Sequence, residues 1–391
     1  MNICIYKHNP RIEVTAAIMD AYIRAFQKLK HNVLIISPDL INESTDQVIK
    51  LAKTFVDLEA DLAICYGFSA MPQINGTYFF RKHSIPLVVL CFENPYFGLT
   101  PALRDEIKRY PDYYHFFIWD SFYLDLLHQE LSNCYPIHHA TEFHELGTAG
   151  RLYESVPDKD IAFVGNMTDF VRLRASRIQN KNSLNGVIDE VMLAKINNPA
   201  LNVIEILRDA LSRRQTEDGT GIKASEKEDF FHNKIIFPLY EEGLGRYRYH
   251  VLNQLEMFNI HYYGNMSWNA PHIEFHPPVD YYKELPQIYR STKINLDIPP
   301  FQSIHAPNNR LFDVAAAGSL ILTERKSGVA EIFDDTESIV YMNIEDLKEK
   351  IRFYLGNDHI RRQISYELHN LIVNKHTYTH RAEYILDTLR P

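Results

Sequence analysis

The stretch KINLDIPPFQSIHAPNNRLFDVAAAGSLILT, residues 293–323, decides the fold that the sequence predicts. It begins with an apolar strand that ends at Ile298, continues through a proline-rich loop at 299–307 and a helix from Asn308, and ends in a second apolar strand after Gly318. Two strands joined by a helix are typical of a parallel sheet, in which ligands bind beyond the carboxyl ends of the strands. We therefore expect a binding site where this loop meets this helix, because a helix N-terminus favours phosphate.

Polar side chains crowd this junction. Amide, imidazole and guanidinium groups there can bind an anion, and a carboxylate one helical turn further on can accept hydrogen bonds from ligand hydroxyls. The side chains concerned are Gln302, His305, Asn308, Asn309, Arg310 and Asp313. A sugar nucleotide carries both phosphate and hydroxyl groups and fits this set. An ordinary strand-helix-strand unit with a solvated loop gives the same pattern, so the residues alone leave both interpretations open.

The N-terminal half of the chain alternates apolar strands with amphipathic helices. The strands are predicted at 2–8, 32–37, 61–67, 86–93, 114–120 and 135–140. Their nearly continuous apolar runs indicate burial on both faces, and hence a parallel sheet covered by helices. The first strand is followed by KHNPRIE, without a G-x-G-x-x-G motif, so we expect this half to bind a second substrate and not a dinucleotide.

Two loop residues of this half are candidates for a general base. Glu93 ends an apolar strand before an Asn-Pro pair, where burial would raise the pKa of its carboxyl group. A carboxylate that caps the following turn is the alternative interpretation. His8 follows the first strand, and an unperturbed imidazole has a pKa near neutrality. A single loop histidine is more often structural.

The composition is that of a soluble globular protein with two domains. The chain has 391 residues, of which 46% are hydrophobic and 23% are charged. The net charge of -9 argues against nucleic acid as a partner. The four cysteines lack zinc-site spacing, and no segment reads as a signal peptide or a membrane span, so we expect buried thiols, a cytoplasmic location and at most peripheral membrane contact.

A second sheet begins after a domain boundary near residue 150. Residues 145–159 lose periodicity and contain glycine and proline, which is typical of a crossover between domains. The strand that follows ends at Gly165 and Asn166, where a glycine lets backbone approach a ligand closely or simply makes a turn. Residues 170–258 are mainly helical and are predicted to form an insert in the second half.

From Tyr281 onward the sequence resembles the C-terminal domain of GT-B glycosyltransferases, and most of all the CgeB-like (spore maturation protein) branch. The resemblance is carried by RLFDVAAAGSLILTE, by VAEIFDDTESIVYMNIEDLKEKIRFYLGND and by HTYTHR, and it covers roughly residues 160–381. It implies an α/β fold of the GT-B type, with two Rossmann-like parallel-sheet domains facing a cleft.

The same resemblance implies a different function for each domain of the chain. Residues 1–150 would form the N-terminal Rossmann-like acceptor domain, and residues 151–375 the C-terminal Rossmann-like domain for the nucleotide-sugar donor, with the helical insert. Residues 376–391 would form a terminal helix, which in GT-B folds often returns to the first domain.

The resemblance also assigns contacts to the diphosphate of the donor. GT-B proteins use the first loop of the second domain for this purpose, which points to Gly165 and Asn166. Arg246 resembles an arginine that follows a glycine in the family, and Arg248 is the alternative contact.

Further donor contacts are implied by the loops around the nucleotide. Gly264 and His276 end two short strands whose loops would flank the base. In the retaining enzymes of the wider group, one helix carries two glutamates in an E-x7-E pattern. The corresponding positions are His305 and Asp313, so this sequence departs from the pattern and leaves the stereochemical outcome open.

The implied activity is that of a hexosyltransferase-like glycosyltransferase. It would move a sugar from a nucleotide-sugar donor to a glycan, protein or lipid-linked acceptor, such as a surface polysaccharide. It would need no metal and no cofactor besides the nucleotide sugar as co-substrate, because Arg246 and Arg310 would stabilise the departing diphosphate. Arg310→Ala is expected to lower turnover on the order of 10²-fold with little change in melting temperature. The alternatives are a GT-B-like sugar-nucleotide epimerase and a non-catalytic module that binds a nucleotide sugar or a partner.

Overall fold

The computed structural model describes most of the chain and divides it into two units. The described residues are 1–7, 13–36, 59–68, 73–74, 77–145, 157–179, 184–218 and 231–390. The first unit is Met1–Glu142 together with Lys375–Pro391, and the second is Phe143–Asn374. We expected divisions near residues 150 and 375. No helix among the described residues is long and apolar enough to cross a membrane.

The first unit contains a six-stranded parallel sheet with the strand order β2-β1-β3-β6-β7-β8. Its strands are β1 (Asn2–Tyr6), β2 (Asn32–Ile36), β3 (Leu62–Tyr66), β6 (Leu87–Cys91), β7 (Tyr114–Ile118) and β8 (Cys134–Pro136). All six strands predicted from the apolar runs are therefore confirmed. The strand β6, LVVLC, is buried along its whole length, as the continuous apolar run requires.

The remaining elements of the first unit are helices and one short hairpin. The helices are α1 (Glu13–Lys28), α3 (Phe79–Lys82), α4 (Pro101–Arg109), α5 (Ser121–His128) and α16 (Tyr378–Thr388), and the hairpin pairs β4 (Gln73–Ile74) with β5 (Thr77–Tyr78). The four cysteines are free and buried, as predicted. Burial raises the pKa of the Cys4 and Cys134 thiols to about 12, so both stay protonated and unreactive.

The second unit contains another six-stranded parallel sheet, with the order β11-β10-β9-β12-β13-β14. Its strands are β9 (Lys159–Val164), β10 (Ile260–Tyr263), β11 (Ile273–His276), β12 (Thr292–Asp297), β13 (Leu320–Glu324) and β14 (Val340–Tyr341). Helices α11 (Leu285–Arg290), α12 (Asn309–Ala316), α13 (Thr336–Ile339), α14 (Ile344–Gly356) and α15 (Asp358–Lys375) complete this α/β unit. The strand-loop-helix-strand unit predicted within residues 293–323 is thus confirmed as β12, α12 and β13.

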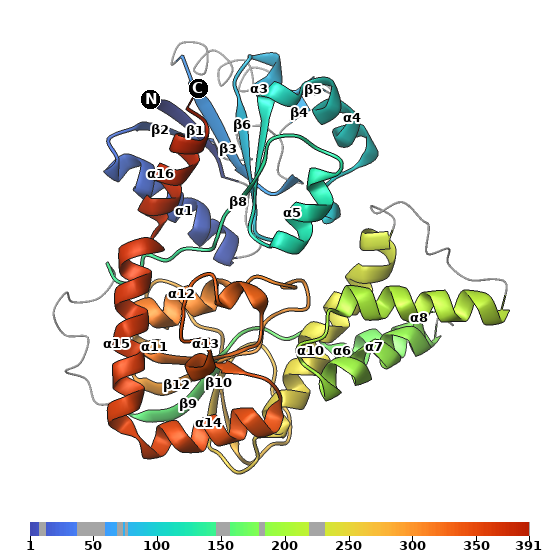
Figure 1. Ribbon diagram of the computed structural model, residues 1–391, viewed down its shortest axis with the longest axis vertical. Coiled ribbons are helices and arrows are strands. Elements are labelled where there is room, and N and C mark those ends of the chain that lie inside the picture. Colours follow the sequence, from blue (N-terminus) through green and yellow to red (C-terminus); the bar gives the residue numbers. More distant parts are fainter. Residues whose placement is uncertain are drawn as a thin grey trace. The chain divides into compact units, whose positions relative to one another are not determined.

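The predicted helical insert is also present in the second unit. It consists of α6 (Phe170–Gln179), α7 (Asn185–Asn197), α8 (Val203–Asp218), a π-helical turn at Phe231–Ile236 and α10 (Phe237–Asn253). These helices are gathered beside the sheet of this unit (Figure 1). The helix α10 leads from the insert back to β10. Its side chains contact both the insert and the loops at the carboxyl ends of the strands.

The C-terminal helix α16 packs against α1 within the first unit (Figure 1). The rings of Tyr22 and Tyr378 meet edge to face with centroids 5.1 Å apart. The Arg381 guanidinium donates hydrogen bonds to the backbone carbonyls of His138 and His139, at 2.9 and 3.0 Å, and lies 2.5 Å from Nδ1 of His376. The arginine of the HTYTHR motif therefore fixes the returning helix to the end of the first sheet.

This contact predicts that the folded protein becomes less stable as the pH falls. Burial, and then Arg381 and His138, lower the pKa of His376 from 6.5 to about 3. At pH 5 the unfolded chain protonates this ring and the folded chain does not, so its contribution to stability is lost as the pH falls from about 6.5 towards about 3. The free energy of unfolding, measured with urea, should fall between pH 7 and pH 5 in both proteins. We expect this fall to be about 2 kcal/mol smaller in His376→Asn than in the wild type. The exposed His359 supplies the control, since His359→Asn should keep the wild-type pH dependence; an unchanged pH dependence in His376→Asn contradicts the prediction.

Candidate functional site

The loops that follow β9 and β12 meet the start of α12 at one edge of the second sheet. The strands β9 and β12 are hydrogen-bonded neighbours, with Phe163 opposite Leu296, so Gly165 and Asp297 lie at the same edge. Asn308 is the N-cap of α12, and its Oδ1 accepts a hydrogen bond from the backbone N–H of Arg310 at 2.8 Å. The sequence predicted a ligand site at this edge.

A buried carboxylate, Asp297, organises this junction. Its Oδ1 accepts hydrogen bonds from Nη1 of Arg310 at 2.5 Å and from Nδ2 of Asn308 at 2.9 Å, and its Oδ2 accepts from the hydroxyl of Thr323 at 2.8 Å. The side chain of Asp297 is 0% exposed and that of Arg310 is 12% exposed. Sequence analysis did not single out Asp297, although a carboxylate that ends a buried strand in front of a polar loop is a recognisable signal.

Two guanidinium groups converge on Gly165. A Cβ atom at this glycine would lie 3.1 Å from Nη2 of Arg310 and 3.4 Å from Nη1 of Arg248. Both guanidinium carbons also lie over the ring of Phe163, at 5.3 Å and 5.4 Å from its centroid. The absence of a side chain at this glycine therefore lets two cationic groups come close to its backbone, and the predicted diphosphate contact stays a prediction.

Arg248 is buried without a carboxylate partner. Its Nε donates to the carbonyl of Ile298 at 3.0 Å, and its Nη1 donates to the carbonyl of Asn166 at 2.6 Å. In the part of the chain that the structure describes, Arg248 makes no ion pair, whereas Arg310 pairs with Asp297. Burial, and then the neighbouring Arg310, lower the pKa of Arg248 to about 9. The charge of Asp297 raises this pKa in part, and the group is still charged at pH 7, so an anion bound here would meet a buried cation that makes no ion pair with the described residues.

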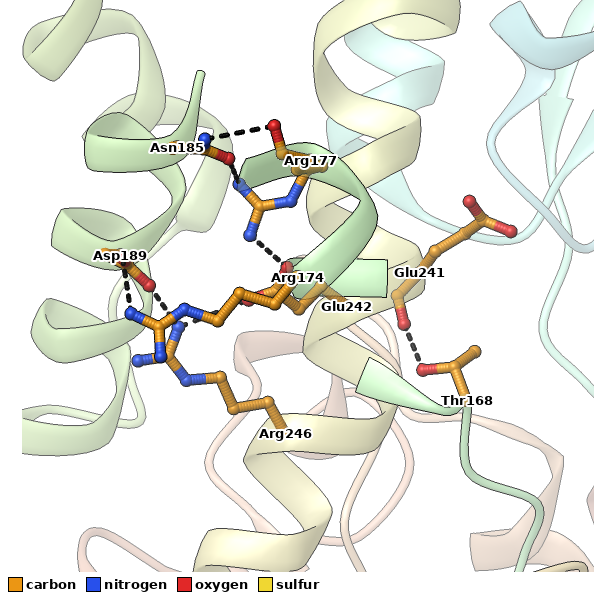
Figure 2. A network of polar contacts seen from close by, with 8 residues as sticks. All are labelled: Thr168, Arg174, Arg177, Asn185, Asp189, Glu241, Glu242 and Arg246. Carbon is orange, nitrogen blue, oxygen red and sulfur yellow. Dashed lines mark hydrogen bonds and ion pairs between the residues drawn. The ribbon is translucent and has the colours of Figure 1, made fainter. Parts of the chain in front are cut away.

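Arg246 lies elsewhere. Its Nη1 is 2.5 Å from a carboxylate oxygen of Asp189 and 3.2 Å from one of Glu242, in the network of the helical insert shown in Figure 2. Arg174 and Arg177 belong to the same network. Residues two apart on a helix point in nearly opposite directions, so only one of Arg246 and Arg248 can face Gly165. The structure brings Arg248 there, and Arg246 binds the carboxylates of the insert.

Gly264 approaches the Gly165 loop from the next strand. A Cβ atom at Gly264 would lie 2.6 Å from the carbonyl oxygen of Gly165, so this position has no space for a side chain. The N–H of Gly264 donates to the carbonyl of His276 at 3.1 Å. The imidazole of His276 lies on the face of the sheet with His261, 3.1 Å away between ring nitrogens. Asn166 is exposed and contributes its carbonyl to Arg248.

Some of the remaining residues predicted to bind the donor already make hydrogen bonds within the protein. Asp313 is 1% exposed, and its Oδ2 accepts hydrogen bonds from the hydroxyl of Tyr281 at 2.8 Å and from Nδ2 of Asn309 at 3.2 Å. Both contacts involve Oδ2, and the predicted role of Asp313 in binding the ribose stays a prediction. Gln302 and His305 are half-buried in the loop before α12, where the carbonyl of His305 accepts from Gly328 at 2.9 Å.

The candidates for a general base belong to the first unit. Glu93 lies two residues after β6, which ends at Cys91, and burial raises the pKa of its carboxyl group, as expected from the sequence. The following turn is capped by Asn94, whose Oδ1 accepts from the N–H of Tyr96 at 3.1 Å. His8 lies outside the described residues.

Comparisons with known proteins address the fold. Residues 248–387 match the family described as glycosyl transferase-like, and this match begins at Arg248. No curated protein sequence matches the chain. Among solved structures, sucrose-phosphate synthase (tll1590) from Thermosynechococcus elongatus has 11% identity, a TM-score of 0.51 and coverage of 99% of this chain and 98% of that chain.

Two further structures are similar over their full length. Anabaena Alr3699/HepE in complex with UDP and glucose has 10% identity and a TM-score of 0.52, covering 100% of this chain and 99% of that chain. T4 phage BGT in complex with its UDP-glucose substrate has 10% identity and a TM-score of 0.50, covering 100% of both chains. The chain has the GT-B glycosyltransferase fold. The predicted GT-B fold is thus confirmed, and the predicted glycosyltransferase is confirmed at the level of its family domain and its fold.

The buried ion pair in this GT-B fold changes one expectation from the sequence. Arg310→Ala would leave the Asp297 carboxylate buried without its guanidinium, and breaking such a pair costs about 3–5 kcal/mol. We now expect a lower melting temperature as well as lower activity. Thermal unfolding followed by circular dichroism measures it, with the exposed Arg325→Ala as the control. The double variant Arg310→Ala/Asp297→Asn should recover part of the loss, and a wild-type melting temperature for Arg310→Ala contradicts the expectation.

Proposed function

We propose that the protein is a glycosyltransferase that binds the diphosphate of a nucleotide sugar against Gly165, Arg248 and the N-terminus of α12. The observation that carries this proposal is the buried guanidinium of Arg248, which lies 3.4 Å from the Cβ position of a glycine and has only backbone carbonyls as hydrogen-bond partners among the described residues. A bidentate phosphate contact would supply the missing negative charge.

The donor that we propose is a UDP sugar. The structures of HepE and BGT that resemble this chain are described as complexes with UDP and glucose and with UDP-glucose. The protein contributes two guanidinium groups and the amides of a capped helix, which together can bind both phosphates of such a donor. In this proposal Asn309, Gln302 and His305 line the sugar and nucleoside parts of the donor, and Asp313 holds the Tyr281 segment in place.

The proposed reaction breaks the bond between the anomeric carbon and the diphosphate oxygen. Negative charge develops on the leaving diphosphate, and Arg248, Arg310 and the α12 amides would stabilise it more in the transition state than in the ground state. Because these groups provide the positive charge, we propose that the transfer needs no metal ion. The acceptor hydroxyl forms the new bond to the anomeric carbon and gives up its proton, for which Glu93, or His8, is the proposed base in an inverting reaction.

The finer assignments also belong to the proposal. The stretches RLFDVAAAGSLILTE and HTYTHR support membership of the CgeB-like branch, and the free buried cysteines support a cytoplasmic protein. The acceptor that we propose is a glycan, a protein or a lipid-linked glycan such as a precursor of a surface polysaccharide. An acceptor panel with radiolabelled UDP-glucose and UDP-galactose addresses this part.

Donor binding is tested by comparing two arginines of the same helix. We expect Arg248→Ala to weaken the binding of UDP at least about 10-fold, because hydrogen bonds to charged groups contribute about 1.5–3 kcal/mol. Arg246→Ala should bind UDP like wild type, since Arg246 pairs with Asp189 and Glu242. Isothermal titration calorimetry with UDP, GDP and UDP-glucose measures both. Equal weakening in the two variants would place the diphosphate elsewhere, and no binding of any nucleotide at millimolar concentration would remove the proposed function.

The role of Glu93 predicts a pH profile. A base must be deprotonated to act, so activity should fall as the pH falls through a pKa that burial has raised above the ordinary carboxyl value. We expect Glu93→Gln to lower kcat on the order of 10²-fold or more while UDP binding stays unchanged. Initial rates from pH 4 to 9 give the acid limb. Wild-type kcat in Glu93→Gln would point to another base, and epimerised donor without acceptor would favour an epimerase.

A further inference from the structure

Three potential metal ligands meet on one face of the second sheet, near its edge. Nδ1 of His261 and Nε2 of His276 are 3.1 Å apart. Carboxylate oxygens of Glu274 lie 3.5 Å from Nδ1 of His261 and 3.4 Å from Nε2 of His276. Among the described residues, no other three His, Cys, Asp or Glu side chains bring their ligand atoms so close together.

The backbone of two strands positions these side chains. The edge strand β11 pairs in parallel with β10, with Glu274 opposite His261 and His276 opposite Tyr263. Side chains two residues apart on a strand share a face, so Glu274 and His276 both point to the side that carries His261. The ring of Tyr263 stacks on that of His276 with centroids 4.3 Å apart and an interplanar angle of 13°. The ligand group is therefore held by strands and by a stacked ring.

The distances fit a metal ion with tetrahedral coordination. Zinc lies about 2.0–2.2 Å from histidine nitrogen and carboxylate oxygen, which places ligand atoms about 3.3–3.6 Å from one another in a tetrahedron. The two imidazole nitrogens are 3.1 Å apart, Oε1 of Glu274 lies 3.4 Å from Nε2 of His276, and Oε2 of Glu274 lies 3.5 Å from Nδ1 of His261. Each separation is at or close to this range, although the two carboxylate distances belong to different oxygens, and one ligand atom from each residue lies within 4.8 Å of the other two. Two imidazoles with one carboxylate form a ligand set that zinc and related transition metals prefer over magnesium or calcium.

We propose that His261, Glu274 and His276 bind one divalent transition metal ion of the zinc type. The side chains are 21%, 65% and 24% exposed, so an ion can enter from solvent and water can occupy a fourth position. A hydrogen bond between the two imidazoles uses a single ring proton, which would move to the other nitrogen of the donating ring when the metal binds. The imidazoles and the carboxylate then act as neutral and anionic ligands without rearrangement of the strands.

The ion would fasten the edge strand of the sheet. Because β11 is paired on one side only, a bond from the metal to both β10 and β11 adds a cross-strand link. Five residues after the end of β11, the hydroxyl of Tyr281 donates a hydrogen bond to Asp313 on α12. The three ligands differ from the residues of the proposed diphosphate site, so this proposal does not depend on the proposed function.

Metal binding is tested on the full-length protein after removal of metal with a chelator. We expect calorimetry to show one Zn²⁺ per chain, and Zn²⁺ to raise the melting temperature of the wild type. The same site filled with Co²⁺ should show the intense visible bands of four-coordinate cobalt. His261→Gln and His276→Gln should each weaken Zn²⁺ binding at least about 10-fold, because each removes one of three ligands.

The exposed histidine His359 supplies the matched control, since His359→Gln should keep the wild-type affinity and cobalt spectrum. Glu274→Gln alters the most exposed ligand and tests the site even where a histidine variant fails to fold, which far-ultraviolet circular dichroism would show. Unchanged Zn²⁺ affinity in Glu274→Gln and in a folded histidine variant would overturn the proposal. So would the absence of Zn²⁺ binding by the wild type at micromolar concentration.

Discussion

The buried carboxylate of Asp297 is the constraint on which the proposed donor site depends. A carboxylate with no exposed surface must be neutralised, and here Arg310, Asn308 and Thr323 all donate to it. These bonds join the end of β12 to the first turn of α12 and to the end of β13. The first turn of α12, which is one part of the proposed phosphate site, is thereby fixed before any ligand binds, which is the preorganisation that electrostatic stabilisation of a leaving group requires.

Positive charge exceeds negative charge near Gly165. Two guanidinium groups lie beside this glycine, and one buried carboxylate compensates one of them. The position of the second, Arg248, follows from how α10 is anchored to the sheet: the hydroxyl of Tyr247 on this helix donates to Glu324 at 2.8 Å, and Lys195 pairs with the same buried carboxylate at 2.6 Å. A buried cation is costly without a partner, so an anionic ligand would gain more here than at a solvated arginine. The helical insert thus contributes to the donor site through the helix that it shares with the sheet.

The fold was largely predictable because each buried strand appears in the sequence as a short apolar run. A strand buried on both faces must be apolar at every position, and LVVLC or LILTE shows this without knowledge of its neighbours. The N-cap of α12 was also predictable, since an asparagine that precedes a polar first turn is a local signal. The site was predictable only in part. Gly165, Asn308 and Arg310 meet as expected, whereas Asp297 was overlooked because its importance comes from three donors spread over 27 residues of chain, from 297 to 323.

By itself, the sequence determined two parallel sheets, the helical insert and the cap that begins α12, because periodicity and capping are properties of short segments, and it predicted a donor site at the end of β12. Only the tertiary structure decided between Arg246 and Arg248, since both lie on the same helix two residues apart and the choice depends on which groups lie opposite each face. It also decided that Asp313 binds Tyr281, and that His261 meets Glu274 and His276 across two strands. Such contacts join residues far apart in sequence, and the free energy that selects them arises from burial and charge in the folded protein.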